Sequence, residues 1–444
     1  MIHHAMSRLT LALLLAVPVS LSSVAYAIPL APTENKDTRG IPMEDVQRFS
    51  NAIAQIKQYY VNPVSDKELF DNAIRGMLAG LDPHSNYLNE EEFLDLQTST
   101  SGEFGGLGIE VTMEDGLIKV ISPLIGAPAM KAGIQAGDYI AKVDSHAVQG
   151  IDLRQAVGLM RGKIGEPVTL TVLRKGEKQP LSFKLVRENI QIKSVDMKLL
   201  DNNYGYIRLA QFQALTSQDM LIGIEKLKKE SGGQLKGLVL DLRNNPGGLL
   251  DSAIQIADAF IDKKPTDKEQ LIVYTEGRLP GSRFTAVANP GDVLHNAPMV
   301  VLINSGSASA SEIVAGALKD HKRAVILGKP SFGKGSVQTV LPLDNKSGIK
   351  LTTALYYTPA GISIQAQGIK PDINIDALSM PKKSEKNPIA NFSEADLHGH
   401  LQNGTKISST SKAKIKADEK ALLYDDYQLY AALTILKSLA LAKH

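Results

Sequence analysis

A run of small residues at 305–311 is the first candidate for chemistry, because it places serines between a buried strand and a helix start. Small residues let the backbone turn sharply, and the free N–H groups at a helix start point toward whatever binds there. A serine in this run can act as a nucleophile whose own turn supplies an oxyanion donor. The competing interpretation is a cluster of helix caps, since serine is a favoured N-cap residue.

A nucleophilic serine needs a base, and lysine is one candidate. Lys334 lies between Gly333 and Gly335, shortly after an apolar run at 324–327. Its pKa would have to fall from about 10.4 toward about 7–8 to accept a proton at neutral pH, and apolar burial can lower it that far. If the following chain is extended, Gln338 lies on the same face and can orient the neutral amine. The competing interpretation is a lysine in a surface turn.

Histidine is the other candidate base. A Ser-His-Asp triad with His321 and Asp320 is conceivable, but these residues follow Ser309 by about three helical turns. No GxSxG motif accompanies them. A phosphate-binding loop at 328–335 is a further alternative, yet its last position is glycine where magnesium binding needs serine or threonine.

Two glycine-containing segments are candidate binding loops. The segment 241–248 leaves an apolar strand and ends in a glycine pair, whose N–H groups are free of steric cover and can supply a second oxyanion donor. The segment 105–108 runs into a strand and can form a backbone nest for a peptide carboxylate, with the adjacent strand edge pairing to the peptide. The competing interpretation of both is an ordinary turn. The second loop consists of Gly105, Gly106, Leu107 and Gly108.

Composition removes several other classes of function. The chain has 444 residues, with 49 Lys and Arg against 47 Asp and Glu, and a net charge of only +2 argues against a nucleic-acid surface. It contains no cysteine, which excludes disulfides, Cys-ligated metals and thiol nucleophiles. No HExxH motif or histidine cluster occurs, so we expect neither a metal nor another cofactor.

The first residues predict export. Arg8 precedes an apolar run at 9–21, and the sequence A-Y-A follows at 25–27. A basic start, a short apolar core and an A-x-A end are typical of a secretory signal peptide, here residues 1–27. An uncleaved anchor is the alternative, but a membrane span needs about 20 apolar residues. Export of a chain without cysteine fits a bacterial periplasm, with no membrane-spanning segment after cleavage.

After residue 27 the pattern of apolar and polar residues changes several times, which predicts a series of segments. Helical periodicity is followed by short alternating strands, and these by strand–helix–strand units of an α/β layer. A last amphipathic helix must bury its apolar stripe on the body or on a second subunit. The expected segments are a linker at 28–42, an N-terminal helical region at 43–100, a β-rich domain at 101–187, an α/β core at 188–376, a flexible spacer at 377–418 and a C-terminal helix at 419–444.

Apolar spacing also places individual elements within these segments. We expect helical structure at 43–96 with a break at 81–84, and helices at 152–162, 249–260, 310–319 and 421–441. We expect strands at 108–111, 117–121, 139–143, 168–174, 181–186, 238–242, 299–303 and 324–327.

The motifs together resemble those of the carboxy-terminal processing peptidases, the Ser/Lys-dyad serine proteases of family S41. The resemblance covers nearly all of 43–376, and the order and spacing of its motifs are specific although each motif alone is weak. It implies a multidomain α/β (α+β) fold with a ClpP/crotonase-like protease core, an inserted β-rich PDZ domain and helical N- and C-terminal regions. The motifs lie at 81–85 (LDPHS), 105–108, 133–138, 241–248, 306–312 and 332–338.

The resemblance assigns a catalytic dyad. It places the family's nucleophile on Ser309, the general base on Lys334, 25 residues later, and an assisting glutamine on Gln338. It also implies that the PDZ domain, with its loop at 105–108, engages substrate C-termini and gates the protease.

The resemblance also assigns the groups around the dyad. The oxyanion donors fall on the amide of Ala310 and on one glycine of the pair Gly247 and Gly248. Glu312 and Asp320 occupy positions where the family often has supporting carboxylates. The choice between the two glycines and the roles of the two carboxylates stay open at this point.

The sequence therefore predicts a periplasmic serine endopeptidase that cleaves proteins near their C-termini through an acyl-enzyme. Its partners are protein or peptide substrates, other copies of the chain joined through the terminal helices, and the activating lipoprotein that some family members require. The alternative is a non-catalytic PDZ-based binder or chaperone on a protease-like scaffold. The retained Ser309, Lys334 and Gln338 argue against that alternative, because an inert scaffold need not keep all three.

Overall fold

The structure is a computed structural model that describes residues 40–201, 203–263, 270–279, 283–378 and 422–442. The expected signal peptide and nearly all of the expected linker and spacer lie outside these residues. The chain forms two compact units, one ending at Leu69 and the other beginning at Phe70. None of the described helices has the length and apolar character needed to cross a membrane.

The expected N-terminal helical region contains three helices. They are α1 (Met43–Tyr59), α2 (Asp66–Ala79) and α3 (Glu90–Ser101), and the expected break lies between the last two. The break is a turn in which Asp82 Oδ1 accepts hydrogen bonds from the N–H groups of His84 and Ser85, at 2.8 and 3.0 Å. The short strand β1 (Asn86–Leu88) follows, which the sequence did not predict because three residues show no periodicity.

The β-rich domain holds its own core. Its sheet has the order β3-β4-β5-β7-β8, with β6 beside β5, and it packs with α4 and α5. All five expected strands and the expected helix are present. The bounds are β3 Ile109–Glu114, β4 Leu117–Pro123, α4 Pro128–Ala132, β5 Tyr139–Val143, β6 His146–Ala147, α5 Leu153–Met160, β7 Pro167–Leu173 and β8 Leu181–Val186.

A short two-stranded ladder links this domain to the core. Strand β2 (Glu103–Gly106) pairs antiparallel with β9 (Glu188–Gln191), so the chain enters and leaves the domain side by side. Gly105 and Gly106 are therefore part of a strand, where we had expected a loop.

The core is built on a six-stranded sheet in the order β10-β11-β12-β15-β16-β19, parallel from β11 onward. Strands β12 and β15 are buried along their whole length, as expected of apolar runs in a sheet covered on both faces. The bounds are β10 Val195–Leu200, β11 Tyr204–Leu209, β12 Gly237–Asp241, β15 Met299–Ile303, β16 Val325–Gly328 and β19 Ile373–Asn374.

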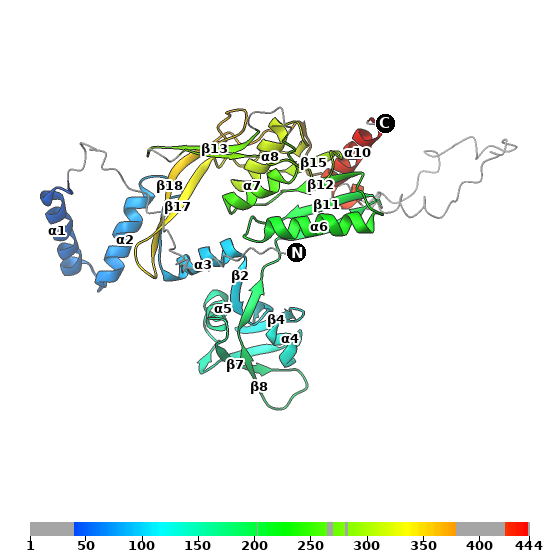
Figure 1. Cartoon of the computed structure of the whole chain (residues 1–444). Coiled ribbons are helices and arrows are strands. Elements are labelled where there is room, and N and C mark those ends of the chain that lie inside the picture. Colours follow the sequence, from blue (N-terminus) through cyan, green and yellow to red (C-terminus); the bar gives the residue numbers. More distant parts are fainter. Residues whose placement is uncertain (1–39, 202, 264–269, 280–282, 379–421, 443–444) are drawn as a thin grey trace, which may run out of the picture. The chain divides into compact units, whose positions relative to one another are not determined.

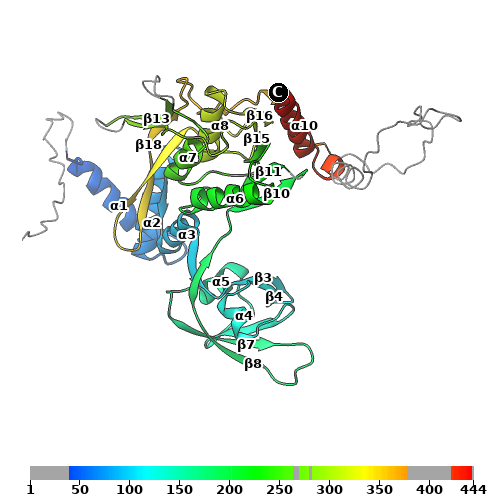
Figure 2. The same cartoon turned by 45° about the vertical axis from the view of Figure 1, so that its right-hand side comes forward.

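Helices cover both faces of this sheet, as can be followed in Figures 1 and 2. Helices α6 (Thr216–Glu230), α7 (Leu250–Asp258) and α8 (Ala310–Asp320) pack on the face that carries Leu240 and Val301. Helix α10 (Tyr427–Ala442) packs on the opposite face, against Val239 and Val300. The apolar stripe of the C-terminal helix is therefore buried on the chain's own core, one of the two expected locations.

A second sheet lies beside the first and carries the β17–β18 hairpin. Its order is β1-β18-β13-β14, with β17 paired to β18. Of these strands the sequence analysis considered only an extended segment after Lys334, which corresponds to β17. The bounds are β13 Leu271–Gly277, β14 Phe284–Val287, β17 Ser336–Pro342 and β18 Gly348–Tyr357.

The packing of α10 leads to a stability prediction. Leu436 is fully buried over Gly237, where an added Cβ would lie 2.8 Å from its side chain. We expect Leu436→Ala to lower the free energy of unfolding by about 2–5 kcal/mol, measured by chemical denaturation. Leu441→Ala, at a position 78% exposed on the same helix, is the control and should change stability by less than about 0.5 kcal/mol. Equal effects of the two variants would contradict the packing.

Candidate active site

The candidate nucleophile Ser309 lies on the sharp turn between β15 and α8. Its φ of 54° and ψ of −115° form a backbone conformation that residues with a side chain rarely adopt. Such a conformation costs about 1–3 kcal/mol and persists only where surrounding contacts hold it. A strained strand-to-helix turn of this kind exposes the nucleophilic serine in other hydrolases. Here the turn forms without a GxSxG motif.

The other serines of the run are placed differently. The buried hydroxyls of Ser307 and Ser311 donate to backbone carbonyls of the loop after β12, at 2.8 and 2.9 Å. Ser305 is exposed, whereas Ser309 is half-buried beside the loop. The geometry therefore separates Ser309 from its neighbours, which support the turn.

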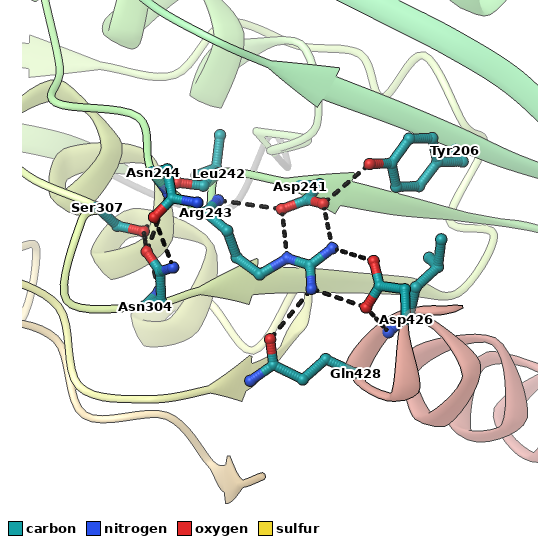
Figure 3. A network of polar contacts seen from close by, with 10 residues as sticks. Tyr206, Asp241, Leu242, Arg243, Asn244, Asn304, Ser307, Asp426 and Gln428 are labelled. Carbon is teal, nitrogen blue, oxygen red and sulfur yellow. Dashed lines mark hydrogen bonds and ion pairs between the residues drawn. The ribbon is translucent and has the colours of Figure 1, made fainter. Parts of the chain in front are cut away.

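Asparagines join the loop after β12 to the loop after β15. Asn244 N–H donates to Asn304 Oδ1, and Asn304 Nδ2 donates back to Asn244 Oδ1, each at 2.9 Å (Figure 3). The buried Asn245 accepts a hydrogen bond from Ala308 N–H at its carbonyl, at 3.0 Å. Its Nδ2 donates to Leu209 O at 2.8 Å. These contacts fix the loop after β12 against the turn that carries Ser309.

The two expected oxyanion donors lie beside this turn. A Cβ added to Gly247 would lie 2.8 Å from Ser309 Cβ and 3.0 Å from Ala310 N, so only glycine allows this approach. The N–H of Gly247 already donates to Asn245 Oδ1 at 2.9 Å. In the part of the chain that the structure describes, the N–H groups of Gly248 and Ala310 have no hydrogen-bond partner. This difference favours Gly248 over Gly247 as the donor.

The carboxylate of Glu312 connects the serine turn to the lysine loop. It is fully buried and accepts hydrogen bonds from the N–H of Ser309 at 2.8 Å and of Lys334 at 2.9 Å. It also accepts from Gly333 N–H at 2.7 Å and from Ser331 Oγ at 2.5 Å. A buried charge is tolerated only when it is fully hydrogen-bonded, and four donors meet that need. Glu312 therefore holds the backbones of both candidate dyad residues at one point.

The side chain of Lys334 is mostly enclosed and carries a perturbed pKa. Burial lowers the pKa of this amine, and the positive charge of Lys350 lowers it further. The charges of Asp82 and Glu312 act in the opposite sense but leave the pKa below its usual value. Within the described residues the amine of Lys334 forms no ion pair, which would have kept it protonated. A buried lysine without a counter-ion is suited to accept a proton.

Tyr356 on β18 is a site residue that the sequence analysis missed. Its hydroxyl donates to the carbonyl of Lys334. Burial raises the pKa of Tyr356 well above its usual value, so the phenol stays protonated. No sequence signal marked it, because a tyrosine in a strand is ordinary and its position depends on the pairing of β17 with β18.

Gln338 lies on β17, but Lys334 precedes this strand, so the simple alternation that we expected between the two residues is not present. The strand begins only at Ser336, and a bulge between Val337 and Gln338 shifts its register. Gln338 Nε2 donates to Ser336 Oγ at 2.8 Å and to Thr352 Oγ1 at 3.4 Å. Thr352 Oγ1 in turn donates to Asp82 Oδ1 at 3.1 Å, which joins the LDPHS motif to strand β18.

Asp320 and His321 lie at the far end of α8 from Ser309. The helix has 11 residues, which separates its ends by about 15 Å. The carboxylate of Asp320 accepts a hydrogen bond from Ala360 N–H at 2.9 Å, and His321 Nε2 lies 2.6 Å from Leu271 O. The structure therefore does not bring Asp320 or His321 to the Ser309 hydroxyl, and a Ser-His-Asp triad with these residues does not form. Among the described residues, no group of three or more His, Asp and Glu is arranged to hold a metal.

The candidate peptide-binding loop borders a small groove of the β-rich domain. The cavity has a volume of about 120 Å³ and lies between the start of β3 and the end of α5. Its lining includes Phe104, Gly106, Leu107, Gly108, Met160 and Arg161. The guanidinium of Arg161 lies 4.6 Å from the ring centroid of Phe104, and its Nη1 lies 3.5 Å from Asp95 Oδ1 on α3. The side chains that line the groove are apolar apart from this one cation.

Comparisons with known proteins identify the domains and the family of the chain. The model of peptidase family S41 matches residues 203–375, a PDZ domain model matches 105–185, and the model named activating protease CtpB N-terminal domain matches 25–92. The carboxy-terminal-processing protease of Bartonella bacilliformis is 46% identical over 397 residues, covering 89% of this chain and 88% of that protein. Carboxy-terminal processing protease CtpA of Bacillus subtilis is 34% identical over 408 residues, covering 90% and 84%. Among solved structures, the photosystem II D1 C-terminal processing protease has 32% identity, a TM-score of 0.43, and coverage of 75% and 91%.

The four hydrogen bonds to Glu312 lead to a prediction. In Glu312→Gln, the amide nitrogen replaces one acceptor oxygen and faces donors that it cannot satisfy. We expect the free energy of unfolding to fall by about 1–3 kcal/mol, measured by chemical denaturation. Glu230→Gln, at an exposed position at the end of α6, is the matched control and should be nearly neutral. Equal stability of the Glu312→Gln variant and the original chain would contradict the buried network.

Proposed function

Because the chain belongs to peptidase family S41 as a carboxy-terminal processing serine peptidase, we propose that it hydrolyses proteins near their C-termini through an acyl-enzyme on Ser309. The general base is Lys334, and Gln338 orients it. The observation that carries the proposal is the Glu312 carboxylate, which holds the N–H groups of Ser309 and Lys334 together.

The proposed reaction uses only groups of this chain and water. Ser309 Oγ attacks the carbonyl carbon of the scissile bond while its proton passes to the neutral amine of Lys334. The N–H groups of Ala310 and Gly248 stabilise the oxyanion of the tetrahedral intermediate. The intermediate expels the amine of the leaving peptide, which takes the proton from Lys334. Water then attacks the ester and gives a proton to Lys334, which passes it to Ser309 Oγ as the ester bond breaks and the new C-terminus leaves.

We further propose that the PDZ domain recognises the C-termini of substrates and gates the protease. The apolar groove beside Leu107 supports recognition, since a strand edge and a groove for one side chain suit an extended peptide. Arg161 supports gating, because it lines the groove and also reaches Asp95 on α3 outside the PDZ domain. A peptide that displaces Arg161 would therefore alter a contact of α3.

Export and assembly are also parts of the proposal. The signal-like sequence at 1–27 supports transport to the periplasm, where an activating lipoprotein is a candidate partner. Assembly through α1 is supported by its exposed apolar side chains, which include Val46 and Ile56, 44% and 42% exposed. The helix buries no residue within its own unit, so its apolar stripe suits a second copy of the chain.

The dyad makes a direct prediction about activity. Ser309→Ala and Lys334→Ala should each lower cleavage of an unfolded protein by at least about 1,000-fold while the circular dichroism spectrum stays unchanged. Ser305→Ala and Lys329→Ala, in the same loops, are the controls and should retain activity. Labelling of Ser309 by a fluorophosphonate should occur in the original chain, which a non-catalytic binder would not show. Undiminished cleavage by either dyad variant would reject the mechanism.

The environment of Lys334 predicts how activity depends on pH. The rate should rise as pH increases through the lowered pKa of Lys334, because the neutral amine is the active form. Lys350→Gln removes a repelling positive charge, so the pKa should rise and the rising limb should move to higher pH. Asp82→Asn removes an attracting negative charge and should move the limb to lower pH.

The opposite signs of these two shifts are the test, read from the pH profile of kcat/KM. Lys346→Gln, an exposed change in the turn between β17 and β18, is the control and should leave the profile in place. Shifts in the same direction for Lys350→Gln and Asp82→Asn would contradict the assignment of Lys334 as the base.

A further inference from the structure

Arg243, at the carboxyl end of β12, uses every N–H group of its guanidinium. Nε and Nη2 donate to the two oxygens of Asp241 at 2.9 and 2.6 Å. Nη1 and Nη2 donate to the two oxygens of Asp426 at 2.9 and 2.7 Å, and Nη1 also donates to Gln428 Oε1 at 3.0 Å. Figure 3 shows the guanidinium lying between the two carboxylates, with Tyr206 bonded to Asp241 from the other side. The arginine side chain is only 15% exposed, so these bonds are largely shielded from water.

Asp426 and Gln428 come from the start of α10, more than 180 residues further along the chain. Gln428 Nε2 also donates to Ile375 O at 2.8 Å, and Ile375 N–H donates to Gly328 O at 2.9 Å. Gly328 ends β16, from which the loop with Lys334 departs. The start of α10 therefore lies at the carboxyl edge of the parallel sheet, the edge where α/β proteins place their sites.

The contact between Arg243 and the start of α10 is connected through the backbone to the loop after β12, which supplies the proposed oxyanion donor. Arg243 directly precedes Asn244 and Asn245, which lock the loop to the serine turn and lead into Gly248. A misplacement of about 1 Å near reacting atoms can cost about 100-fold in rate. Any contact that sets the position of Arg243 therefore also sets the position of the oxyanion donor.

We propose that Asp426 and Gln428 are positioning residues of the peptidase, because they hold Arg243 and thereby fix the loop that supplies the oxyanion donor. This inference rests on the proposed function, since it concerns the same site. Asp426 binds Arg243 and Leu429, and Gln428 binds Arg243 and Ile375, so we expect their loss to act through Arg243, lowering kcat and leaving KM nearly unchanged. The C-terminal helix thus contributes to catalysis as well as to the hydrophobic core.

A second ion pair of the same helix provides the control. Lys437 Nζ lies 2.6 Å from Asp201 Oδ2, and both side chains are mostly buried. Asp201 lies between β10 and β11, before β11 begins, and thus at the amino edge of the sheet. This pair also attaches α10 to the core, but at the opposite end from the loops of the site.

The experiment compares Asp426→Asn, Asp426→Glu, Gln428→Ala and Lys437→Met in the full chain. We measure kcat and KM for an unfolded protein substrate, and the thermal unfolding midpoint of each variant. Asp426→Asn should lower kcat at least about 10-fold with KM changed less than about twofold, and Asp426→Glu should recover part of the loss. Gln428→Ala should show a smaller loss. Lys437→Met should keep kcat within about twofold, even if its unfolding midpoint falls as far as that of Asp426→Asn.

Equal effects of Asp426→Asn and Lys437→Met on kcat would overturn the proposal. An effect of Asp426→Asn on KM alone would also overturn it. If Asp426→Asn does not fold, Gln428→Ala decides, and an unchanged kcat for it would overturn the proposal. Failure of the proposed function looks different, because Ser309→Ala would then cleave the substrate as fast as the original chain.

Discussion

One buried carboxylate holds the site together. Glu312 accepts four hydrogen bonds from two segments that are about 20 residues apart in sequence, and it is shielded from water. Burial makes each bond difficult to replace, since a buried donor or acceptor without its partner is costly. The same bonds help to hold the strained backbone of Ser309, whose N–H is one of the donors. The backbone positions of the two candidate dyad residues therefore depend on this one carboxylate.

The central sheet supplies the rigid support for this contact. Three loops leave the carboxyl ends of β12, β15 and β16, which are neighbours in the sheet, and they carry the candidate oxyanion donor, Ser309 and Lys334 respectively. Helices on both faces shield the strands from water, and the start of α10 adds polar contacts at the carboxyl edge of the sheet. Sites on rigid elements are placed more accurately than sites on loops alone, and here each loop is short and fastened to its neighbour.

The sequence analysis predicted the parts of the fold whose signal is local. Strands β12, β15 and β16 and helix α8 were found because continuous apolar runs and helical spacing mark buried elements. Strand β1 was missed because it exists only through pairing with β18, more than 250 residues away. The resemblance assigned roles to Ser309, Lys334 and Glu312, and in the structure the carboxylate of Glu312 accepts hydrogen bonds from the N–H groups of the other two. The sequence analysis could not predict the positive φ of Ser309 or the position of Tyr356, because both depend on contacts between residues far apart in the sequence.

The same hydrogen-bond pattern explains how a lysine can serve as a base beside an acid. A carboxylate free to bind Lys334 Nζ would form an ion pair and raise the pKa of the amine, which would then stay protonated. Glu312 instead directs both oxygens at three N–H groups and one hydroxyl, including the N–H of Lys334 itself. Asp82 is likewise occupied by its own turn and by Thr352. Glu312 therefore holds the backbone of Lys334, and neither acid forms an ion pair with its amine, so that burial together with Lys350 can lower the pKa of Lys334.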